Sequence, residues 1–203
     1  MSKGNLFVIS APSGSGKTTI IRKLLKKIKN LHFSISCTTR EKRKGEREGK
    51  DYYFISENTF KRMVEKEEFI EWAKVHNFYY GTKKSEVFSW IEKGKDVLLD
   101  IDTQGSFKIK KKYPESIHIF LLPPSFKELE KRLKDRGDLN ESQIKKRLEN
   151  AKIEIKRLKN YDYIIVNDKI ENALNALVQI INSSKFKFET QKEKIEGIIS
   201  SFL

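Results

Sequence analysis

The 203-residue sequence predicts an α/β fold in which helices cover both faces of a parallel sheet. Three observations support this prediction. Strand-like and helix-like runs alternate along the chain, and four of the strand-like runs are continuously apolar, as buried parallel strands are. A glycine-rich turn also joins the first apolar run to a run with helical spacing. The length suits a single domain with small insertions rather than two independent domains.

The expected elements follow in order from apolar patterns. The strand-like runs are Leu6–Ser10, Phe33–Cys37, Phe69–Val75, Asp96–Ile101, Ile117–Leu122 and Tyr163–Val166. The helix-like runs, with apolar residues three and four apart, are Thr18–Ile28, Thr59–Glu67, Lys84–Glu92, Phe126–Arg136, Glu141–Lys159 and Glu171–Ile181. The first strand and the last three are the continuously apolar ones, so we expect them to be covered on both faces.

The sequence between about residues 32 and 82 has a different pattern. Its apolar pieces are short, aromatic and alternating, as in Tyr52–Ile55 and Phe69–Ala73. Alternation is typical of strands with one buried face, so we expect a small mixed-sheet insertion in the α/β core.

The glycine-rich turn reads Ala11-Pro12-Ser13-Gly14-Ser15-Gly16-Lys17-Thr18 and has the flanks of a phosphate-binding loop. Its glycines let backbone amides face phosphate oxygens, and the following helix adds its positive dipole end. Lys17 is expected to reach the β- and γ-phosphates of a nucleoside triphosphate, and Thr18 to offer its hydroxyl to Mg²⁺. Ala11 replaces the usual first glycine, which we interpret as a tolerated variant. An ordinary glycine turn before a surface helix is the alternative.

The chain carries 42 Lys and Arg against 28 Asp and Glu, a formal net charge of +14. This charge fits a nucleic-acid partner, a membrane surface or highly anionic small molecules. Lysine is spread over nearly every expected helix, and no basic motif gathers on one element. We therefore expect much of the charge to be solvated surface and nucleic acid not to be the main partner.

The sequence gives no indication of membrane insertion, disulfides or a metal site built from Cys or His. No apolar run reaches the roughly 18–20 residues of a membrane span, and no signal-peptide core is present, so a cytoplasmic protein without a membrane partner is expected. Cys37 is the only cysteine, and its alternating segment predicts a structural thiol. His32, His76 and His118 lack metal-ligand spacing and are expected to be packed or surface residues.

A second polar constellation lies in the insertion. Arg40 and Arg43, three apart in a glycine-containing loop, can bind one phosphate from two sides. Glu71 lies on an otherwise aromatic strand, and one carboxylate can accept both N1–H and N2–H₂ of guanine, a donor pair that adenine lacks. The alternatives are solvated surface charge for the arginines and an edge-strand surface position for Glu71.

These segments together resemble the guanylate kinase family. The resemblance rests on Phe33–Arg40, Gly49–Phe54, Phe69–Ala73, Tyr79–Thr82, Leu99–Gly105, Pro123–Ser125, Arg136-Gly137, Lys146–Leu148 and Val166–Asp168. It covers residues 5 to about 182 in order. It implies phosphoryl transfer from ATP to GMP, giving ADP and GDP, on a three-layer P-loop core with a GMP-binding insertion and a helical lid.

The resemblance also implies roles for the matching residues. ATP would be bound by Ala11, Pro12, Ser13, Gly14, Ser15, Gly16, Lys17, Thr18, Thr19 and, near adenine, Asn167. GMP would be bound by Ser36, Arg40, Arg43, Tyr52, Glu71, Tyr80, Thr82, Asp100 and Asp102, with the choice of aspartate at guanine left open. The catalytic residues would be Lys17, Arg40, Arg136 and Arg147, the last two brought by lid closure. Thr18 and Asp100 would hold Mg²⁺, Asp100 through water.

Residues 1–203 are expected to form one guanylate-kinase-like domain. Its core would comprise residues 1–31, 85–123 and 151–203, with a GMP-binding subdomain at 32–84 and a lid at 124–150. The expected substrates are ATP and GMP, with dGMP as a further acceptor, and both monomer and homo-oligomer stay open. The role of the extension after Ser183 also stays open, although its apolar residues have helical spacing: Ile195, Ile198, Ile199 and Phe202.

Three other functions fit part of the sequence. Asp102-Thr103-Gln104-Gly105 matches the Asp-x-x-Gly switch motif of GTPases. A GTPase would also need an Asn-Lys-x-Asp motif to bind guanine, and Val166–Lys169 contains similar residues in a different order. Another P-loop nucleotide kinase would require Ser36 and Glu71 to serve a base other than guanine. A non-catalytic guanylate-kinase-like module that binds proteins would be expected to lose phosphate-loop residues, which this chain keeps.

Overall fold

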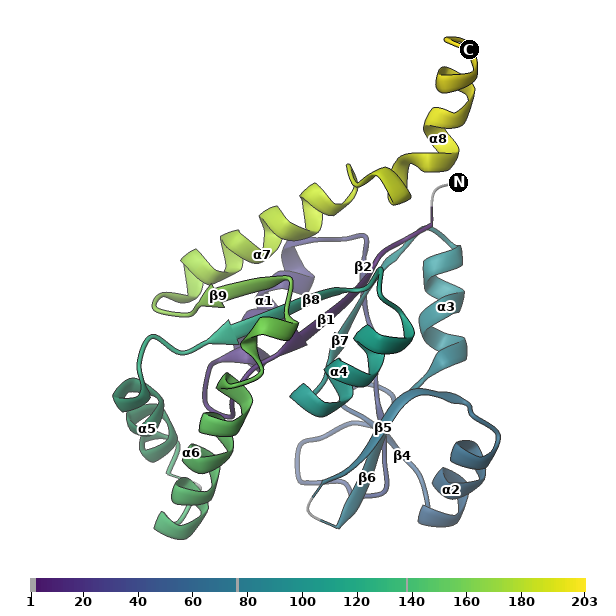
Figure 1. The fold of residues 1–203 in the computed structure, drawn as a ribbon. Coiled ribbons are helices and arrows are strands. Elements are labelled where there is room, and N and C mark those ends of the chain that lie inside the picture. Colours follow the sequence, from purple (N-terminus) through teal and green to yellow (C-terminus); the bar gives the residue numbers. More distant parts are fainter. Residues whose placement is uncertain (1–2, 76, 138) are drawn as a thin grey trace.

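The computed structural model describes residues 3–75, 77–137 and 139–203, and its core is a five-stranded parallel sheet (Figure 1). The strand order is β2-β7-β1-β8-β9. These strands are β1 (Leu6–Ser10), β2 (Leu31–Phe33), β7 (Asp96–Asp100), β8 (Ile117–Leu122) and β9 (Tyr163–Val166). The predicted parallel core is therefore confirmed, because all four pairings in this sheet are parallel.

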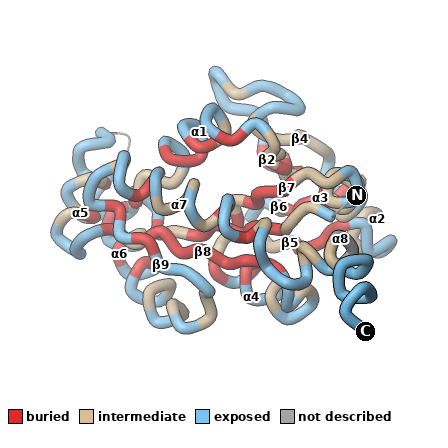
Figure 2. The backbone as a smooth tube through the Cα atoms, turned by 90° about the horizontal axis from the view of Figure 1, so that it is seen from above, coloured by how far each residue is buried: buried red, intermediate tan, exposed pale blue. Residues whose placement is uncertain are grey.

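Helices cover both faces of this sheet and make three layers (Figure 1). One face packs on α1 (Lys17–Lys27) and α7 (Ile170–Ser184), the other on α3 (Lys84–Glu92) and α4 (Thr103–Lys112). Alternate residues of β1 serve the two apolar clusters, which explains why its whole run is apolar. Figure 2 shows this buried interior running along the strands, with exposed backbone around it.

The edge strand β9 departs from the expected double coverage. Ile165 is buried against α7, but Ile164 and Val166, on the other face, are each 48% exposed. The expectation was wrong for this strand: an apolar run marks it as part of the sheet, but β9 lies at the sheet edge.

The insertion forms a separate four-stranded mixed sheet in the order β4-β3-β6-β5. Its elements are β3 (Cys37–Thr38), β4 (Tyr53–Phe54), α2 (Glu57–Glu65), β5 (Phe69–Val75) and β6 (Phe78–Lys83). Phe60 of α2 stacks on Phe69 and Tyr79, with ring centroids 4.4 and 5.3 Å away. Cys37 is fully buried here, and burial raises the pKa of its thiol to about 11, so it is a structural thiol as expected.

Four local expectations need correction. The predicted strand Phe33–Cys37 is split, because Phe33 ends β2 in the core sheet while Cys37 begins β3 in the second sheet. The strand β6 was not expected, since its aromatic and glycine residues show no clear alternation. Helix α4 was also missed, because it begins Thr-Gln-Gly-Ser without apolar spacing. The expected helix at 141–159 ends at Ile155, and a 3₁₀ turn (Leu158–Asn160) follows.

Two helices beyond the core sheet, α5 (Phe126–Asp135) and α6 (Glu141–Ile155), form a small unit with its own apolar cluster. Ser125 caps α5, and Asn140 with Gln143 forms a capping box on α6. The last helix, α8 (Phe188–Ser200), projects from the body (Figure 1). Among the described residues, no helix is long and apolar enough to cross a membrane.

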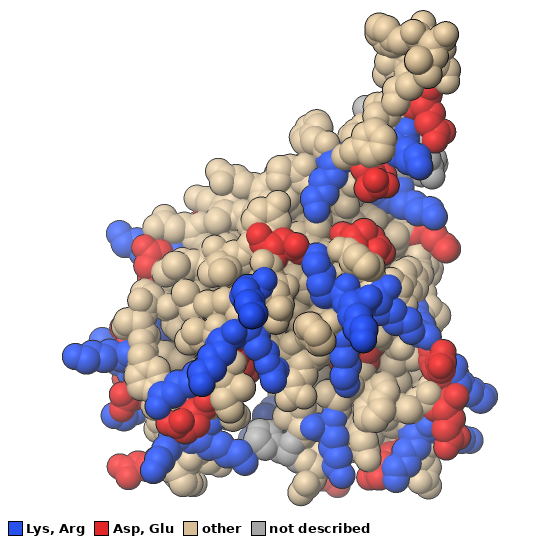
Figure 3. Space-filling view, viewed as in Figure 1, with Lys and Arg blue, Asp and Glu red and all other residues tan. Residues whose placement is uncertain are grey.

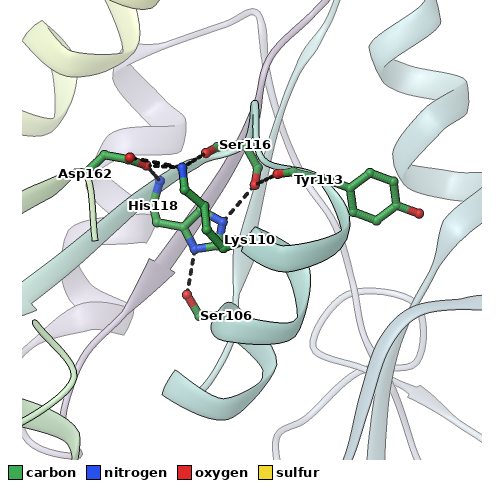
Figure 4. Close-up of polar contacts among 6 residues, drawn as sticks. All are labelled: Ser106, Lys110, Tyr113, Ser116, His118 and Asp162. Carbon is green, nitrogen blue, oxygen red and sulfur yellow. Dashed lines mark hydrogen bonds and ion pairs between the residues drawn. The ribbon is translucent and has the colours of Figure 1, made fainter. Parts of the chain in front are cut away.

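A buried polar network ties β8 to α4 and to the start of β9 (Figure 4). The His118 ring nitrogens lie 2.7 Å from Ser106 Oγ and 2.8 Å from Ser116 Oγ. Asp162 accepts the His118 amide at 2.7 Å and the Lys110 ammonium at 2.8 Å. His118 is thus a packed histidine, as expected, and burial lowers its pKa to about 4. His32 stacks on Trp90, whereas His76 lies outside the described residues.

Candidate functional site

The glycine-rich loop turns sharply between β1 and α1. Gly14 (φ 93°) and Gly16 (φ 86°) adopt the left-handed conformation that favours glycine, and the Ser15 amide donates to the Pro12 carbonyl at 3.1 Å. Asn167 braces the loop, since its Nδ2 donates to the Ser15 carbonyl at 2.6 Å. A Cβ at Gly16 would lie only 2.7 Å from that Nδ2, so a side chain here would displace the Asn167 amide in addition to straining the backbone.

Lys17, at the start of α1, forms an ion pair with Asp100 at the end of β7. The adjacent parallel strands β1 and β7 bring these two groups together. Glu154 of α6 faces the same lysine: burial raises the pKa of Glu154 to about 7, and the charge of Lys17 opposes that rise. The Lys17 ammonium thus lies between the carboxylates of Asp100 and Glu154.

The loop borders a cleft of about 1150 Å³. Of the predicted ATP-binding residues, it is lined by Ala11, Pro12, Ser13, Gly14, Gly16, Lys17, Thr18 and Thr19. Its lining also includes six basic side chains, namely Lys17, Lys74, Arg132, Arg136, Arg147 and Arg157, against the carboxylates of Asp102 and Glu154. In Figure 3, Lys and Arg side chains (blue) are frequent over the centre and the lower part of the molecule. The excess of positive charge suits highly anionic small molecules.

The two-helix unit α5–α6 closes one side of the cleft. Arg147 Nη1 of α6 donates to Ser13 Oγ of the loop at 2.8 Å. Arg136, at the end of α5, lines the same cleft. Arg132 of α5 donates to the Asn167 carbonyl at 3.2 Å. The structure thus brings both predicted lid arginines to the cleft, and Arg147 to the phosphate-binding loop itself.

A buried polar chain joins three residues predicted for base recognition. Ser36 Oγ lies 3.0 Å from Thr82 Oγ1, which donates to Glu71 Oε1 at 3.3 Å. Burial raises the pKa of Glu71 to about 7, and the nearby charge of Asp102 adds to this effect. Gly105 gives the carboxylate room, since a Cβ there would lie 2.9 Å from Glu71 Oε2.

A second cluster holds three of the four residues predicted for phosphate binding. The Arg40 guanidinium lies 5.5 Å from the Tyr52 ring centroid, and that ring is 5.9 Å from Tyr80. Arg40 pairs in bidentate fashion with Glu46, at 2.7 and 3.0 Å, and this pairing lowers the pKa of Glu46. The Arg43 backbone amide also donates to Glu46, at 2.8 Å, and the Arg43 side chain is exposed.

Asp102 lies between the base-recognition chain and the triphosphate cleft. Its Oδ1 accepts the amides of Gln104 and Gly105 at 2.8 and 2.7 Å and so caps α4. It lines the cleft, and its charge reaches Glu71. Asp100, by contrast, is engaged with Lys17. Among the described residues, no group of three or more His, Cys, Asp or Glu is arranged to hold a metal ion by itself.

Residues 3–184 match the protein-family model described as guanylate kinase. The chain belongs to the guanylate kinase family. The guanylate kinase of Thermotoga maritima is 49% identical over 96% of this chain and 94% of its own. That of Buchnera aphidicola subsp. Schizaphis graminum is 47% identical over 100% of this chain and 99% of its own.

A solved structure agrees with this family assignment. The crystal structure of guanylate kinase from Anaplasma phagocytophilum superposes with a TM-score of 0.79 at 36% identity, and the match covers 96% of this chain and 95% of that one. The fold predicted from the resemblance, a parallel core with a mixed-sheet insertion, is therefore that of a guanylate kinase.

Sequence reasoning missed five charged residues at this guanylate kinase site. They are Glu46, Lys74, Arg132, Glu154 and Arg157. Arg157 Nη1 donates to Thr103 Oγ1 at 2.9 Å and thereby joins the end of α6 to α4. Glu154 could have been found: it follows Ala151 by three residues on the buried side of α6, where an apolar residue is expected. Glu46 lies in a loop rich in Lys, Arg and Glu, where no spacing marks it.

Proposed function

We propose that this chain transfers the γ-phosphate of ATP to GMP, giving ADP and GDP, and that the residues described above perform the transfer. One observation carries the proposal. Asp102 lines the basic cleft at the phosphate-binding loop, and its charge also reaches Glu71 of the buried Ser36–Thr82–Glu71 chain. This supports a triphosphate site and a guanine-binding carboxylate within one site.

In this proposal, ATP occupies the loop and the basic cleft. The loop amides and the start of α1 bind the phosphates, with Lys17 between the β- and γ-phosphates. Arg136 and Arg147 add positive charge from the lid, and Asn167 lies toward adenine. The ion pair between Lys17 and Asp100 must rearrange as the triphosphate binds, because the ammonium is shared with that carboxylate.

Mg²⁺ fits the oxygen donors of this site. Thr18 lines the cleft and carries a hydroxyl, and Asp100 ends the neighbouring strand β7 with a carboxylate; both are the hard oxygen ligands that Mg²⁺ prefers. Bound with ATP, the ion would neutralise charge on the β- and γ-phosphates. Thr18 would hold it directly and Asp100 through water.

GMP, or dGMP as a further acceptor, would bind through the insertion. Glu71 accepts the guanine N1–H and N2–H₂ while Ser36 and Thr82 hold its carboxylate in place, and Asp102 stands beside this pocket. The phosphate is bound by Arg40, Arg43, Tyr52 and Tyr80. Glu46 now occupies the Arg40 fork as a phosphate would, so GMP must displace it or approach another edge of the guanidinium.

The transfer needs positioning and positive charge rather than a strong base. Its loose transition state spreads charge over three phosphoryl oxygens, and the cleft surrounds that charge with Lys17 and the lid arginines. Closure of α5–α6 and of the insertion over both nucleotides excludes water and limits hydrolysis of ATP. The reactive GMP phosphate oxygen is already anionic and requires no proton acceptor.

Lys17→Ala tests the loop assignment. We expect the rate of ADP formation from ATP and GMP to fall by at least about a thousandfold, because the positive charge that offsets repulsion between the phosphates is lost. Lys23→Ala is the matched control: it removes a lysine from the same helix, but Lys23 pairs with Glu171 on the surface, so activity should be unchanged. Circular dichroism should show both variants folded, and a Lys17→Ala protein with normal turnover would refute the assignment.

A further inference from the structure

A second cavity, of about 290 Å³, lies where α4 of the core meets β5 of the insertion (Figure 1). It shares no described lining residue with the triphosphate cleft. Glu71 of β5 forms part of its wall, so the cavity lies behind the carboxylate assigned above to guanine. The insertion contributes Trp72, and the core contributes Lys84 of α3 together with Lys108 and Lys112 of α4. An occupant of this lysine cavity would therefore touch both parts of the molecule.

The lysine cavity carries positive charge that the protein does not neutralise. Lys108 and Lys112 are four residues apart, so their like charges lie on one face of α4. Within the described part of the chain, no carboxylate forms an ion pair with either of these two lysines. Lys108 Nζ instead donates to the Trp72 carbonyl at 3.2 Å. Lys84 pairs only at 3.9 Å with Glu67, whose side chain is 83% exposed, and such surface pairs are weak.

The rest of the cavity wall is largely apolar. Val64, Phe69 and Ile70 line it beside Trp72, which is 38% exposed. Apolar walls with a few polar groups are typical of small-molecule sites, whose volumes run from about 300 to 1,000 Å³. A cavity of about 290 Å³ is at the small end of that range. The site therefore suits a small molecule that joins an apolar group to an anionic group.

We propose that the lysine cavity binds a small phosphate ester, with its apolar group against Trp72 and its phosphate between Lys108 and Lys112. Lysine ammonium groups bind phosphate as point charges and need no fixed fork geometry. A phosphate monoester carries close to two negative charges at neutral pH, which matches the two lysines that lack a carboxylate partner. A carboxylate would neutralise only one of them.

Occupation of the lysine cavity should weaken GMP binding, an effect that rests on the function proposed above. Burial raises the pKa of Glu71, and the charge of Lys108 opposes that rise. A phosphate bound at Lys108 would cancel part of this charge, so the ionised carboxylate that accepts the guanine donors would be less favoured. The coupling is reciprocal: GMP should weaken binding of the phosphate ester by the same factor.

Phenyl phosphate, which joins a ring to a phosphate, is the probe for the site. Titrated into the nucleotide-free protein, it should change the tryptophan fluorescence, because Trp72 lines the cavity while the other tryptophan, Trp90, stacks on His32. Lys112→Gln should raise the dissociation constant at least fivefold. Lys111→Gln is the matched control, since this neighbouring lysine of α4 does not line the cavity and its loss should leave the constant unchanged.

Three binding results would overturn the site. They are no binding to the folded wild type, an equal loss of affinity in the two variants, and displacement of the probe by ATP with unchanged affinity in Lys112→Gln. The last result would place phenyl phosphate in the triphosphate cleft.

Steady-state kinetics tests the coupling to GMP. Saturating phenyl phosphate should raise KM for GMP about threefold in the wild type and in Lys111→Gln, but not in Lys112→Gln, and KM for ATP should not change. Binding without any rise in KM for GMP would contradict the coupling. A protein that binds phenyl phosphate through Lys112 but phosphorylates no GMP would contradict the proposed function while supporting the cavity site.

Discussion

At the scale of single residues, Glu71 is a buried carboxylate that costs stability in the free protein. Its pKa is raised from 4.5 to about 7 because burial disfavours the charge. Folding therefore favours the protonated form, and the cost to stability grows from pH 4.5 to pH 7 and is complete above it. The guanine site proposed above requires the ionised form, because only a carboxylate accepts both guanine donors.

Because the buried charge of Glu71 lowers stability, we expect Glu71→Gln to be more stable than the wild type but to use GMP poorly. Glu71→Gln should raise the melting temperature at pH 8, because it removes a buried charge, and the gain should shrink toward pH 4.5. Thermal unfolding followed by circular dichroism at the two pH values measures the difference. A melting temperature that falls equally at both would show that the carboxylate stabilises the free protein.

The same carboxylate predicts how GMP use depends on pH. Between pH 7 and pH 6 the ionised fraction of a group with a pKa of about 7 falls about fivefold, so KM for GMP should rise by a similar factor. GMP's own phosphate also titrates near pH 6, and Glu71→Gln serves as the control because only Glu71's contribution is removed. Equal pH dependence in both proteins would place Glu71 outside the guanine site.

At the scale of elements, the sequence was sufficient to predict the bounds of a strand or helix wherever the apolar pattern was unambiguous. The strands β1, β5, β8 and β9 have the predicted bounds, and so does α3. The P-loop could be read because strand, glycines and helix stand in fixed order. These elements place the ends of β1 and β7 side by side, and hence Lys17 beside Asp100.

The rest depended on contacts between distant segments. Nothing local separates Phe33 from Cys37, yet they belong to different sheets, because the chain crosses from core to insertion between them. Likewise the Arg40–Glu46 pair joins two residues of a uniformly charged loop, and only the folded loop shows which carboxylate faces Arg40. The exposure of one face of β9 likewise depends on its place at the edge of the sheet, which its own residues do not reveal.

Helix α6 supplies an element-scale prediction. Arg147→Ala should lower kcat about a hundredfold while KM for GMP changes little, because the role proposed for its guanidinium is at the transferring phosphoryl group. Lys145→Ala, exposed on the same helix, is the control. Steady-state kinetics with GMP varied at saturating ATP separates the two constants. A raised KM with normal kcat would instead assign Arg147 to substrate binding.

At the scale of the whole molecule, His118 links the core layers and makes them sensitive to acid. Its pKa is lowered from 6.5 to about 4 by burial, with the charge of Lys110 adding to the effect. Between pH 6.5 and pH 4, His118 is therefore protonated in the unfolded chain but not in the folded chain. The free energy of unfolding falls as pH drops through this range. The melting temperature should fall less between pH 7.5 and pH 5 in His118→Gln than in the wild type. Equal decreases would exclude His118 as the acid-sensitive group.

In the proposed function, one molecule combines the triphosphate cleft with an insertion that binds guanine. Measuring ADP formation from Mg²⁺-ATP with GMP, dGMP, AMP, CMP, UMP and dTMP in turn tests this combination. Rapid turnover with GMP, retained with dGMP and nearly absent with the other four, is the predicted result. Comparable turnover with AMP would contradict the guanine site, ADP release without any acceptor would indicate an ATPase, and inactivity of the folded protein with every acceptor would indicate a protein-binding module.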